Sequence, residues 1–408
     1  MKWVSALSKQ ADIDTAVQEA TEEIIRQLEG EEADLTIIFI APQYKDFYDK
    51  VPELINRYLK PGLLFGCSGG GIIGNGEEVE QQAAFSITCA KMPGVKIQTF
   101  YSETKTLPDQ DTSPSVWRDW LNVKIEDQPH FIFLADPFSF RGEEFLAGID
   151  FAYPNSKKVG GLASGAQALG GNALYLADKI YDNGLIGIAL SGDIELDTIV
   201  AQGCRPIGKP MKITECQDTL LKEIDGKPTL EVLQALNETL SDSDKKLLQT
   251  SLFLGIEMNP MKDDPKQGDF LIRNLMGVDR ESGALAIGAL LRTGQLVQFH
   301  LRDKKMSAED LDVMLTRYQS LGQTENARGA LLFSCLGRGK YLYGEANHDT
   351  NMFRNKLGEI PLGGFFCNGE IAVSYTHLRA HETREDRGCR GGLEKKKGGG
   401  GGGGGGGG

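Results

Sequence analysis

The chain has 408 residues, and 57 Asp and Glu outnumber 44 Lys and Arg, which gives a net charge of −13. This acidic balance, without a basic run that could neutralise several phosphates, argues against partners such as nucleic acid or an anionic membrane. No stretch approaches the roughly 18 apolar residues of a membrane span, and the N-terminus lacks the apolar region of a signal peptide. We therefore expect a cytosolic (cytoplasmic) protein.

The first half of the chain alternates between apolar strands and helical periodicity. In chain order the pattern predicts a helix over 13–28, a strand over 35–40, a helix over 47–59, strands over 63–67, 84–89 and 95–100, a helix over 115–121 and a strand over 131–134. The order strand, helix, strand implies a crossover and a partly parallel sheet. Asp182-Asn183-Gly184, between the apolar runs 173–177 and 185–190, predicts a tight hairpin.

The second half begins after a helix predicted over 229–240, where the polar segment 241–246 interrupts the apolar pattern. We place the change of domain near residues 230–245. The pattern then predicts strands over 253–258, 270–275, 284–290 and 296–301, a helix from about 307 to 321, and strands over 330–335 and 362–367.

The expected fold is therefore α/β of the mixed α+β kind, with two domains that each hold a mixed sheet and flanking helices. The expected division is an N-terminal helix over 1–32, a first domain over 33–230, a second domain over 231–371 and a tail over 372–408. An internal echo links GLLFGCSGGG at 62–71, GALLFSCLGRG at 329–339 and PLGGFFCNGE at 361–370. It indicates related strand-to-loop units, with chance similarity as the alternative.

The tail over 372–408 has a different character from the body. It reads AVSYTHLRAHETREDRGCRGGLEKKK and then eleven glycines, with no apolar period after Tyr375. Such a composition cannot build a core. The string SYTHLRAHET resembles a translated sequencing adapter, and a run of G base calls would encode the glycines. We therefore expect an artefactual or disordered tail, and a natural sequence truncated near Ile371.

Catalytic motifs are incomplete. Gly69 to Gly74 satisfies G-x-G-x-x-G, but a polar stretch and another strand follow where a dinucleotide site needs a long helix. Cys67 could be a nucleophile, yet the sequence nominates no base for it, and Ser164 lacks the first glycine of a nucleophile elbow. We therefore expect no catalytic residues, no metal site and no cofactor.

Two polar pairs adjoin apolar strands of the second domain: Arg273-Asn274 and Arg302-Asp303. Arginine offers a planar fork of donors that suits a carboxylate. The alternative is a structural ion pair at the strand ends, formed between the two segments. The spacing alone leaves both interpretations open.

The segments LLFGCSGGGIIG, DFLIRNLMGVD, VQFHLRD, RGALLFSCLGRG and IPLGGFFCNGEI, in this order, resemble the N-terminal and C-terminal domains of the FIST family over about residues 33–371. The resemblance implies a stand-alone sensory protein of signal transduction that binds a small molecule, with amino acids as the candidate class, and signals to a partner protein that the sequence does not identify. We expect the ligand near the ends of the second-domain strands. The expected binding residues are Arg273, Asn274, Arg302, Asp303, Cys335, Cys367, Asn368 and Glu370, with Cys67 and Ser68 of the first domain closing over them.

Two alternatives remain. Some members of the family are thought to bind haem, so a haem-based sensor of nitric oxide is the runner-up, with His300, His348 and the cysteines as candidate axial ligands. An uncharacterised enzyme is the weaker alternative.

Overall fold

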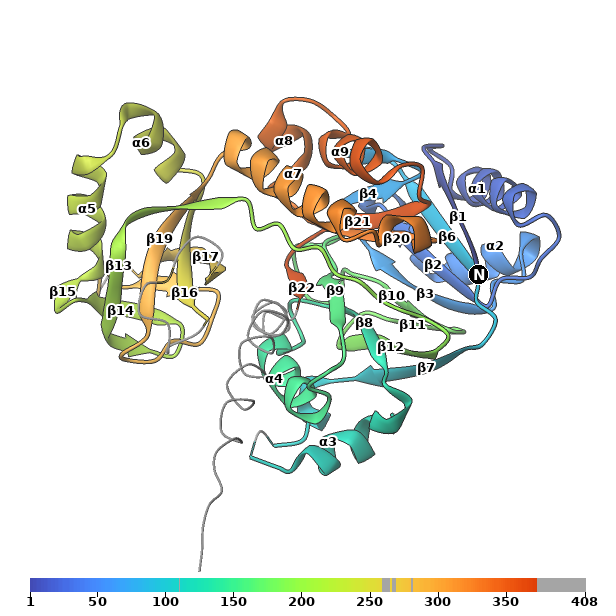
Figure 1. Ribbon diagram of the computed structural model, residues 1–408, viewed down its shortest axis with the longest axis horizontal. Helices are drawn as coiled ribbons and strands as arrows, with labels where there is room; N and C mark the ends of the chain where they lie inside the picture. The colour runs from blue at the N-terminus through green and yellow to red at the C-terminus, as the bar shows by residue number, and fades with distance from the viewer. Residues whose placement is uncertain (110, 259–264, 266–268, 280–281, 373–408) are drawn as a thin grey trace, which may run out of the picture. The chain divides into compact units, whose positions relative to one another are not determined.

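The computed structural model describes residues 1–109, 111–258, 265, 269–279 and 282–372, and residues 1–372 form one compact unit. Within the described residues, the strands form four sheets of six, five, seven and four strands (Figure 1). The prediction of a mixed α+β fold is confirmed. Apart from Ala372, the predicted tail lies outside the described residues.

Two mixed sheets form the larger core. The six-stranded sheet has the order β1 (Lys2–Ser8), β6 (Phe85–Lys91), β2 (Leu35–Ile40), β3 (Leu63–Ser68), β10 (Leu174–Leu176) and β11 (Lys179–Tyr181). The five-stranded sheet has the order β22 (Glu370–Ala372), β9 (Lys158–Leu162), β8 (His130–Ala135), β12 (Leu185–Gly192) and β7 (Val95–Ser102). Apolar side chains of both sheets share one buried cluster, so the sheets pack face to face.

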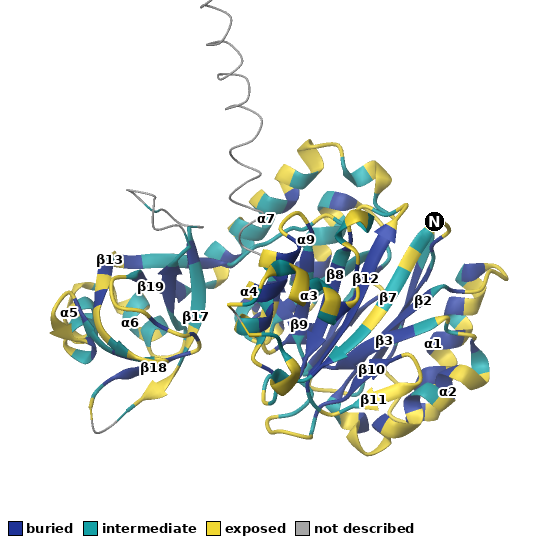
Figure 2. Ribbon diagram, turned by 90° about the horizontal axis from the view of Figure 1, so that it is seen from below, coloured by how far each residue is buried: buried dark blue, intermediate teal, exposed yellow. Residues whose placement is uncertain are grey.

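Helices cover the outer faces of these two sheets. Helices α1 (Ile13–Leu28) and α2 (Val51–Tyr58) pack on the six-stranded sheet, while α3 (Pro114–Leu121) and α4 (Gly142–Ala152) pack on the five-stranded sheet. Figure 2 shows the consequence, since the central strands are buried and the helices expose one side. Strands buried on both faces are continuously apolar, and all six residues of β2 are buried.

The remaining sheets use the rest of the chain. The four-stranded sheet has the order β20 (Ala330–Cys335), β21 (Leu362–Cys367), β4 (Gly71–Gly74) and β5 (Glu77–Glu80). The antiparallel seven-stranded sheet has the order β13 (Cys204–Gln217), β19 (Leu296–Arg302), β16 (Leu252–Glu257), β17 (Phe270–Val278), β18 (Leu285–Ile287), β14 (Leu220–Ile224) and β15 (Lys227–Pro228). The other helices are α5 (Thr229–Thr239), α6 (Asp242–Leu248), α7 (Lys304–Ser320), α8 (Gly339–Tyr343) and α9 (His348–Leu357).

The three mixed sheets of the described chain exchange strands in a cycle. Each contains one parallel pair: β2 with β3, β8 with β9, and β20 with β21. The strand that follows each pair joins a different sheet, since β4 pairs with β21, β22 pairs with β9 and β10 pairs with β3. The echo in the sequence reflects this arrangement, because 62–71 and 361–370 hold the second strands of two such pairs.

Each parallel pair has a glycine where the two strands approach closely. A Cβ at Gly66 would lie 2.1 Å from the carbonyl oxygen of Ile38, its partner in register. Gly160 and Gly364 face the carbonyl oxygens of their own partners at 1.8 and 2.1 Å, and both have φ above +150°. Real Cβ contacts are never this short, so a side chain at any of these positions would push the strands apart.

The secondary structure departs from the sequence-based expectation at several elements. The hairpin predicted across Asp182-Asn183-Gly184 is wrong, because β12 pairs with β7 and β8, whereas β10 pairs with β11. The structure adds β1 ahead of the predicted first helix, and adds α4, α8 and α9.

Strands β13 to β15, which precede residue 230, join β16 to β19 in one sheet. The proposed domain boundary at 230 remains a prediction. None of the described helices is both long and apolar enough to cross a membrane.

The close approach at Gly364 predicts a large loss of stability in Gly364→Ala. The new Cβ would meet the Leu332 carbonyl oxygen at 2.1 Å, so we expect a loss of about 3 kcal/mol or more in urea unfolding. Gly277→Ala is the matched control, because Gly277 has the same φ of +156° but nothing within 4 Å of its Cβ. It should lose about 1 kcal/mol. Equal losses in the two variants would show that backbone strain, and not the close approach, sets the cost.

Candidate functional site

The candidate site is built around Arg302, the last residue of β19. Its Nη1 donates a hydrogen bond to the Cys335 Sγ at 3.2 Å, and its guanidinium lies over the Phe253 ring, 4.6 Å from the centroid. Its Nε is buried and has no hydrogen-bond partner among the described residues. Cys204 lies opposite Arg302 on β13. The surroundings of this arginine are thus thiols and an aromatic ring.

The loops after β20 and β21 supply the next residues. Cys335 and Cys367 end these two parallel strands in direct register. Cys367 is fully buried, which raises the pKa of its thiol, whereas Asn368 and Glu370 are exposed. The Glu370 carboxylate is close enough to Arg302 to favour its charge, but makes no ion pair with it within 4 Å. The site therefore combines a half-buried cation with an exposed polar rim.

Another arginine, Arg338, is buried in the loop that follows Cys335. Its Nε and Nη2 donate to the two carboxylate oxygens of Asp349, at 2.7 and 3.1 Å, and Nη2 also donates to the Tyr343 hydroxyl at 2.6 Å. Both members of the ion pair are less than a tenth exposed. This bidentate geometry is the strong form of an arginine–carboxylate contact.

The Asp349 carboxylate is held in its ionised form. Burial alone would raise its pKa, but the hydrogen bond from His348 Nδ1, at 3.0 Å, and the adjacent Arg338 guanidinium lower the pKa to about 2. The His348 ring stacks on Tyr343 with centroids 3.5 Å apart. The positive charge of Arg338 is therefore paired with the Asp349 carboxylate, whereas Arg302 makes no such ion pair with a described residue.

The structure places Arg273 on the opposite face of the sheet from Arg302. On β16, Leu254 lies opposite Arg273, and the next residue, Phe253, lies opposite both Asn274 and His300. Residues directly opposite share a face, and neighbours along a strand alternate faces. Asn274 thus shares the face of Arg302, while the Arg273 side chain pairs with Glu143 of α4 at 2.9 Å.

The other predicted binding residues have structural partners. Asp303 caps α7, accepting from the Met306 backbone N–H at 2.8 Å, and accepts a second bond from Arg205 Nε at 2.8 Å. Cys67 is buried in the core between the two large sheets, and burial raises the pKa of its thiol. The Ser68 hydroxyl donates to Asn172 and accepts from the Ala173 N–H.

The histidines considered for haem also have protein partners. The His300 Nδ1 lies 2.9 Å from the Gln298 carbonyl oxygen, and the side chain is buried, which lowers its pKa. His348 is paired with Asp349 as described above. In the described part of the chain, no three His, Cys, Asp or Glu side chains are arranged to hold a metal ion.

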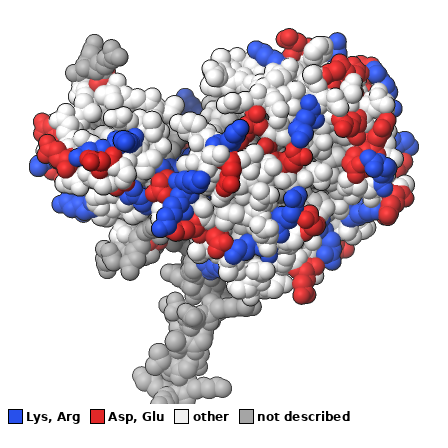
Figure 3. Space-filling model, turned by 90° about the horizontal axis from the view of Figure 1, so that it is seen from above, with Lys and Arg blue, Asp and Glu red and all other residues white. Residues whose placement is uncertain are grey.

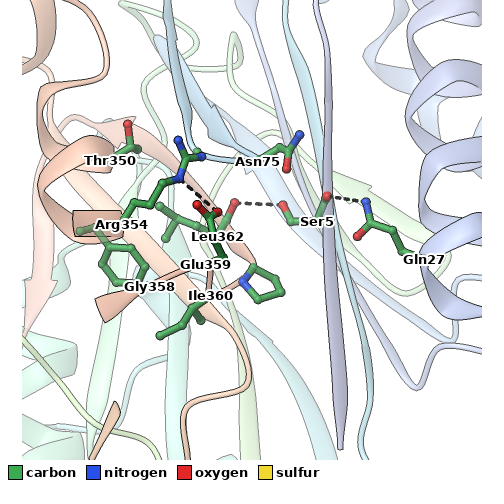
Figure 4. A pocket seen from close by; sticks show the side chains of 12 residues that line it. Ser5, Gln27, Asn75, Thr350, Arg354, Gly358, Glu359, Ile360 and Leu362 are labelled. Carbon is green, nitrogen blue, oxygen red and sulfur yellow. Dashed lines mark hydrogen bonds and ion pairs between the residues drawn. The ribbon is translucent and has the colours of Figure 1, made fainter. Parts of the chain in front are cut away.

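Two cavities stand out among the described residues, and neither is lined by Arg302. The smaller, of about 130 Å³, lies between β1, α1 and α9 (Figure 4). Its polar groups are largely paired with one another, since Arg354 meets Glu359 at 3.2 Å and the Ser5 hydroxyl donates to the Leu362 carbonyl at 2.9 Å. The larger, of about 440 Å³, is lined by residues 103–105, 169–170 and 182–184 and by Ser139.

The structure therefore brings Arg302 and Cys335 into contact, with Cys367 beside Cys335 and Glu370 close enough to act on Arg302 electrostatically. Asn368 follows Cys367 directly, and Asn274 lies on the face of Arg302 but two strands away, on β17. Sequence reasoning missed Cys204, Arg338 and Asp349. Arg338 had one usable signal, since it stands between two glycines directly after an apolar strand. Asp349 had none, because it lies in a short polar helix that the periodicity did not indicate.

The buried Arg338–Asp349 pair predicts a large effect of neutralising one partner. Asp349→Asn leaves the arginine charge buried without a counter-charge, so we expect a loss of about 3 kcal/mol in urea unfolding. Glu359→Gln, which neutralises the exposed partner of Arg354, should cost about 0.5 kcal/mol or less. If Asp349→Asn were as stable as Glu359→Gln, the assignment of a strong buried ion pair would be wrong.

Comparison with known proteins identifies the family. The FIST N domain model matches residues 34–227, and the FIST C domain model matches residues 232–373. The chain is 29% identical over 376 residues to a protein of Mycobacterium tuberculosis (strain H37Rv) titled uncharacterized, covering 92% of this chain and 96% of that one. It is 30% identical over 361 residues to an uncharacterized protein of Mycobacterium bovis, covering 88% and 91%.

A plant relative shares only part of its length with the chain. An F-box/LRR-repeat protein of Arabidopsis thaliana is 24% identical over 210 residues, which cover 47% of this chain and 40% of the plant protein. The two domain models together span most of the described residues. FIST domains are generally sensory and signal-transducing rather than catalytic, and they are thought to bind small ligands. The chain therefore belongs to the FIST family.

Proposed function

We propose that this protein is a sensor for a small metabolite bearing a carboxylate, and that Arg302 is the residue that binds the carboxylate. An amino acid is the preferred member of this class. The exposed Glu370 carboxylate lies close enough to Arg302 to interact with it electrostatically, so it can receive the ammonium group of such a ligand while the guanidinium holds the carboxylate.

The observation that carries the proposal is the difference between Arg338, which is buried, and Arg302, which is half-buried with a buried Nε. Arg338 has a bidentate carboxylate partner, as a buried cation requires. Arg302 has no carboxylate oxygen within ion-pair distance among the described residues; its hydrogen-bond partners are the thiols of Cys335 and Cys204, and its Nε is buried without a partner. A thiol is a weak acceptor. A ligand carboxylate would supply what this guanidinium lacks.

The rim of the site fits a polar ligand. Asn274 and Asn368 are exposed and offer both donors and acceptors. The backbone N–H of Asn368 is already used, because it donates to the Leu162 carbonyl at 3.0 Å, so its side chain is the group available to a ligand. On the face drawn in Figure 3, acidic and basic side chains are interspersed. A small charged ligand suits such a surface better than a polyanion does.

The proposal is tested by ligand screening followed by substitution. A thermal-shift screen of the full chain against the proteinogenic amino acids and small organic acids should give at least one carboxylate that raises the melting temperature, because a ligand that binds the folded state stabilises it. Calorimetric titration of that compound into Arg302→Met should then show an affinity loss of about 1.5–3 kcal/mol, the range for a charged hydrogen bond.

Arg273→Met is the matched control. Arg273 is a partly buried arginine in the same sheet, but it lies on the opposite face and pairs with Glu143. It should lower the melting temperature without changing the affinity. The proposed site is wrong if Arg302→Met, still folded by circular dichroism, binds as tightly as the unmodified protein. An affinity loss confined to Arg273→Met would move the site to the other face of the sheet.

A further inference from the structure

A buried carboxylate, Glu78, joins β5 to the segment that carries Arg338 and Asp349. Its side chain is 5% exposed. Oε1 accepts a hydrogen bond from the Thr350 backbone N–H in the first turn of α9, at 2.8 Å, while Oε2 is buried without a partner among the described residues. The Glu78 backbone N–H donates to the Asn347 side chain at 2.7 Å. Glu78 therefore holds the start of α9 against the edge of the four-stranded sheet.

The charges around Glu78 are mostly negative. Glu80 lies on the same strand and accepts from the Lys340 N–H at 2.8 Å. Asp349 faces Glu78 from α9 and Tyr343 faces it from α8. Asp349 is itself paired with the Arg338 guanidinium and hydrogen-bonded to the His348 ring. No ion pair joins Glu78 to a Lys, Arg or His within the residues that the structure describes.

This environment favours the protonated form of Glu78. Burial raises its pKa most, the hydrogen bonds from Thr350 lower it, and the Asp349 and Glu80 carboxylates raise it; the net result is a pKa of about 7. When Glu78 ionises, a second buried negative charge is placed near the Asp349 carboxylate. A protonated Glu78 can instead donate a hydrogen bond, so that Oε2 need not stay unpaired.

We infer that Glu78 is a proton-controlled latch that fixes residues 338–350 to β5 when it is protonated and loosens them when it ionises. The latch goes beyond the proposed ligand binding, because it acts on the fold whether or not a ligand is present. It would nevertheless move Arg338, whose loop follows directly from Cys335.

The sign of the pH effect follows from linkage. The folded-state pKa of Glu78 is above the model value of 4.5, so its contribution to stability is complete below about pH 4.5 and is lost as the pH rises through about 7. Between pH 6 and pH 8 the equilibrium for local opening should increase about tenfold.

Hydrogen exchange of the full chain, followed by mass spectrometry at pH 6, 7 and 8, tests the latch. After correction for the intrinsic exchange rate, amides in peptides spanning 338–350 should open about tenfold more often at pH 8 than at pH 6. In Glu78→Gln, which keeps the shape and cannot ionise, this increase should disappear. Glu77→Gln is the matched control, since Glu77 is the neighbouring residue on β5 and pairs with Lys9 at the surface; it should keep the increase.

The inference is overturned by the same pH dependence in Glu78→Gln as in the unmodified protein, or by no pH dependence in the unmodified protein. If Glu78→Gln yields no folded protein, the comparison of the unmodified protein with Glu77→Gln still decides the matter. The absence of a tenfold change in both would then refute the latch. A pH effect spread equally over peptides from all the sheets would also refute it, because the latch acts locally.

Discussion

The close contact between a glycine and the carbonyl oxygen of its partner strand is the constraint on which the rest of the structure depends. It recurs at Gly66, Gly160 and Gly364, once in each parallel pair of the described sheets. The strand that follows each parallel pair joins a neighbouring sheet. The loops at the carboxyl ends of the parallel strands therefore meet. The Ser164 hydroxyl, for example, accepts from the Gly70 N–H and donates to the Phe366 carbonyl.

The same geometry explains why two neighbouring arginines have different partners. Both lie where a strand ends: Arg338 follows β20 and Arg302 ends β19. The loop after β20 turns back toward α9, which brings Asp349 to Arg338. Arg302 instead lies opposite Cys204 at the start of β13, and it contacts Cys335 at the end of β20. The electrostatic difference between them thus originates in strand register.

The sequence predicted β2, β3, β8 and α1 well. Their apolar residues follow burial directly, as continuous runs in the three buried strands and as one face of the helix. The prediction failed where strand pairing depends on distant segments. Asp182-Asn183-Gly184 has residues typical of a hairpin turn, but β12 pairs with β7 and β8 instead of with the strand before the turn. For the site, the pattern indicated Arg302, Cys335 and Cys367. It could not separate the faces of Arg273 and Arg302, since that requires the register of β16 with β17 and β19.

Strand exchange among the sheets also affects the order in which the protein can be completed during synthesis. Strand β4 is made early, yet its Gly74 pairs with Gly363 of β21, and Ser5 of β1 donates to the Leu362 carbonyl. About 290 residues separate β4 from β21, which at the usual pace of translation corresponds to roughly 15 to 60 seconds. Throughout that interval β4 can pair with β5, but its other edge has no partner, because β21 does not yet exist. Ribosome-associated chaperones are the natural means of covering such an edge until the last strands emerge.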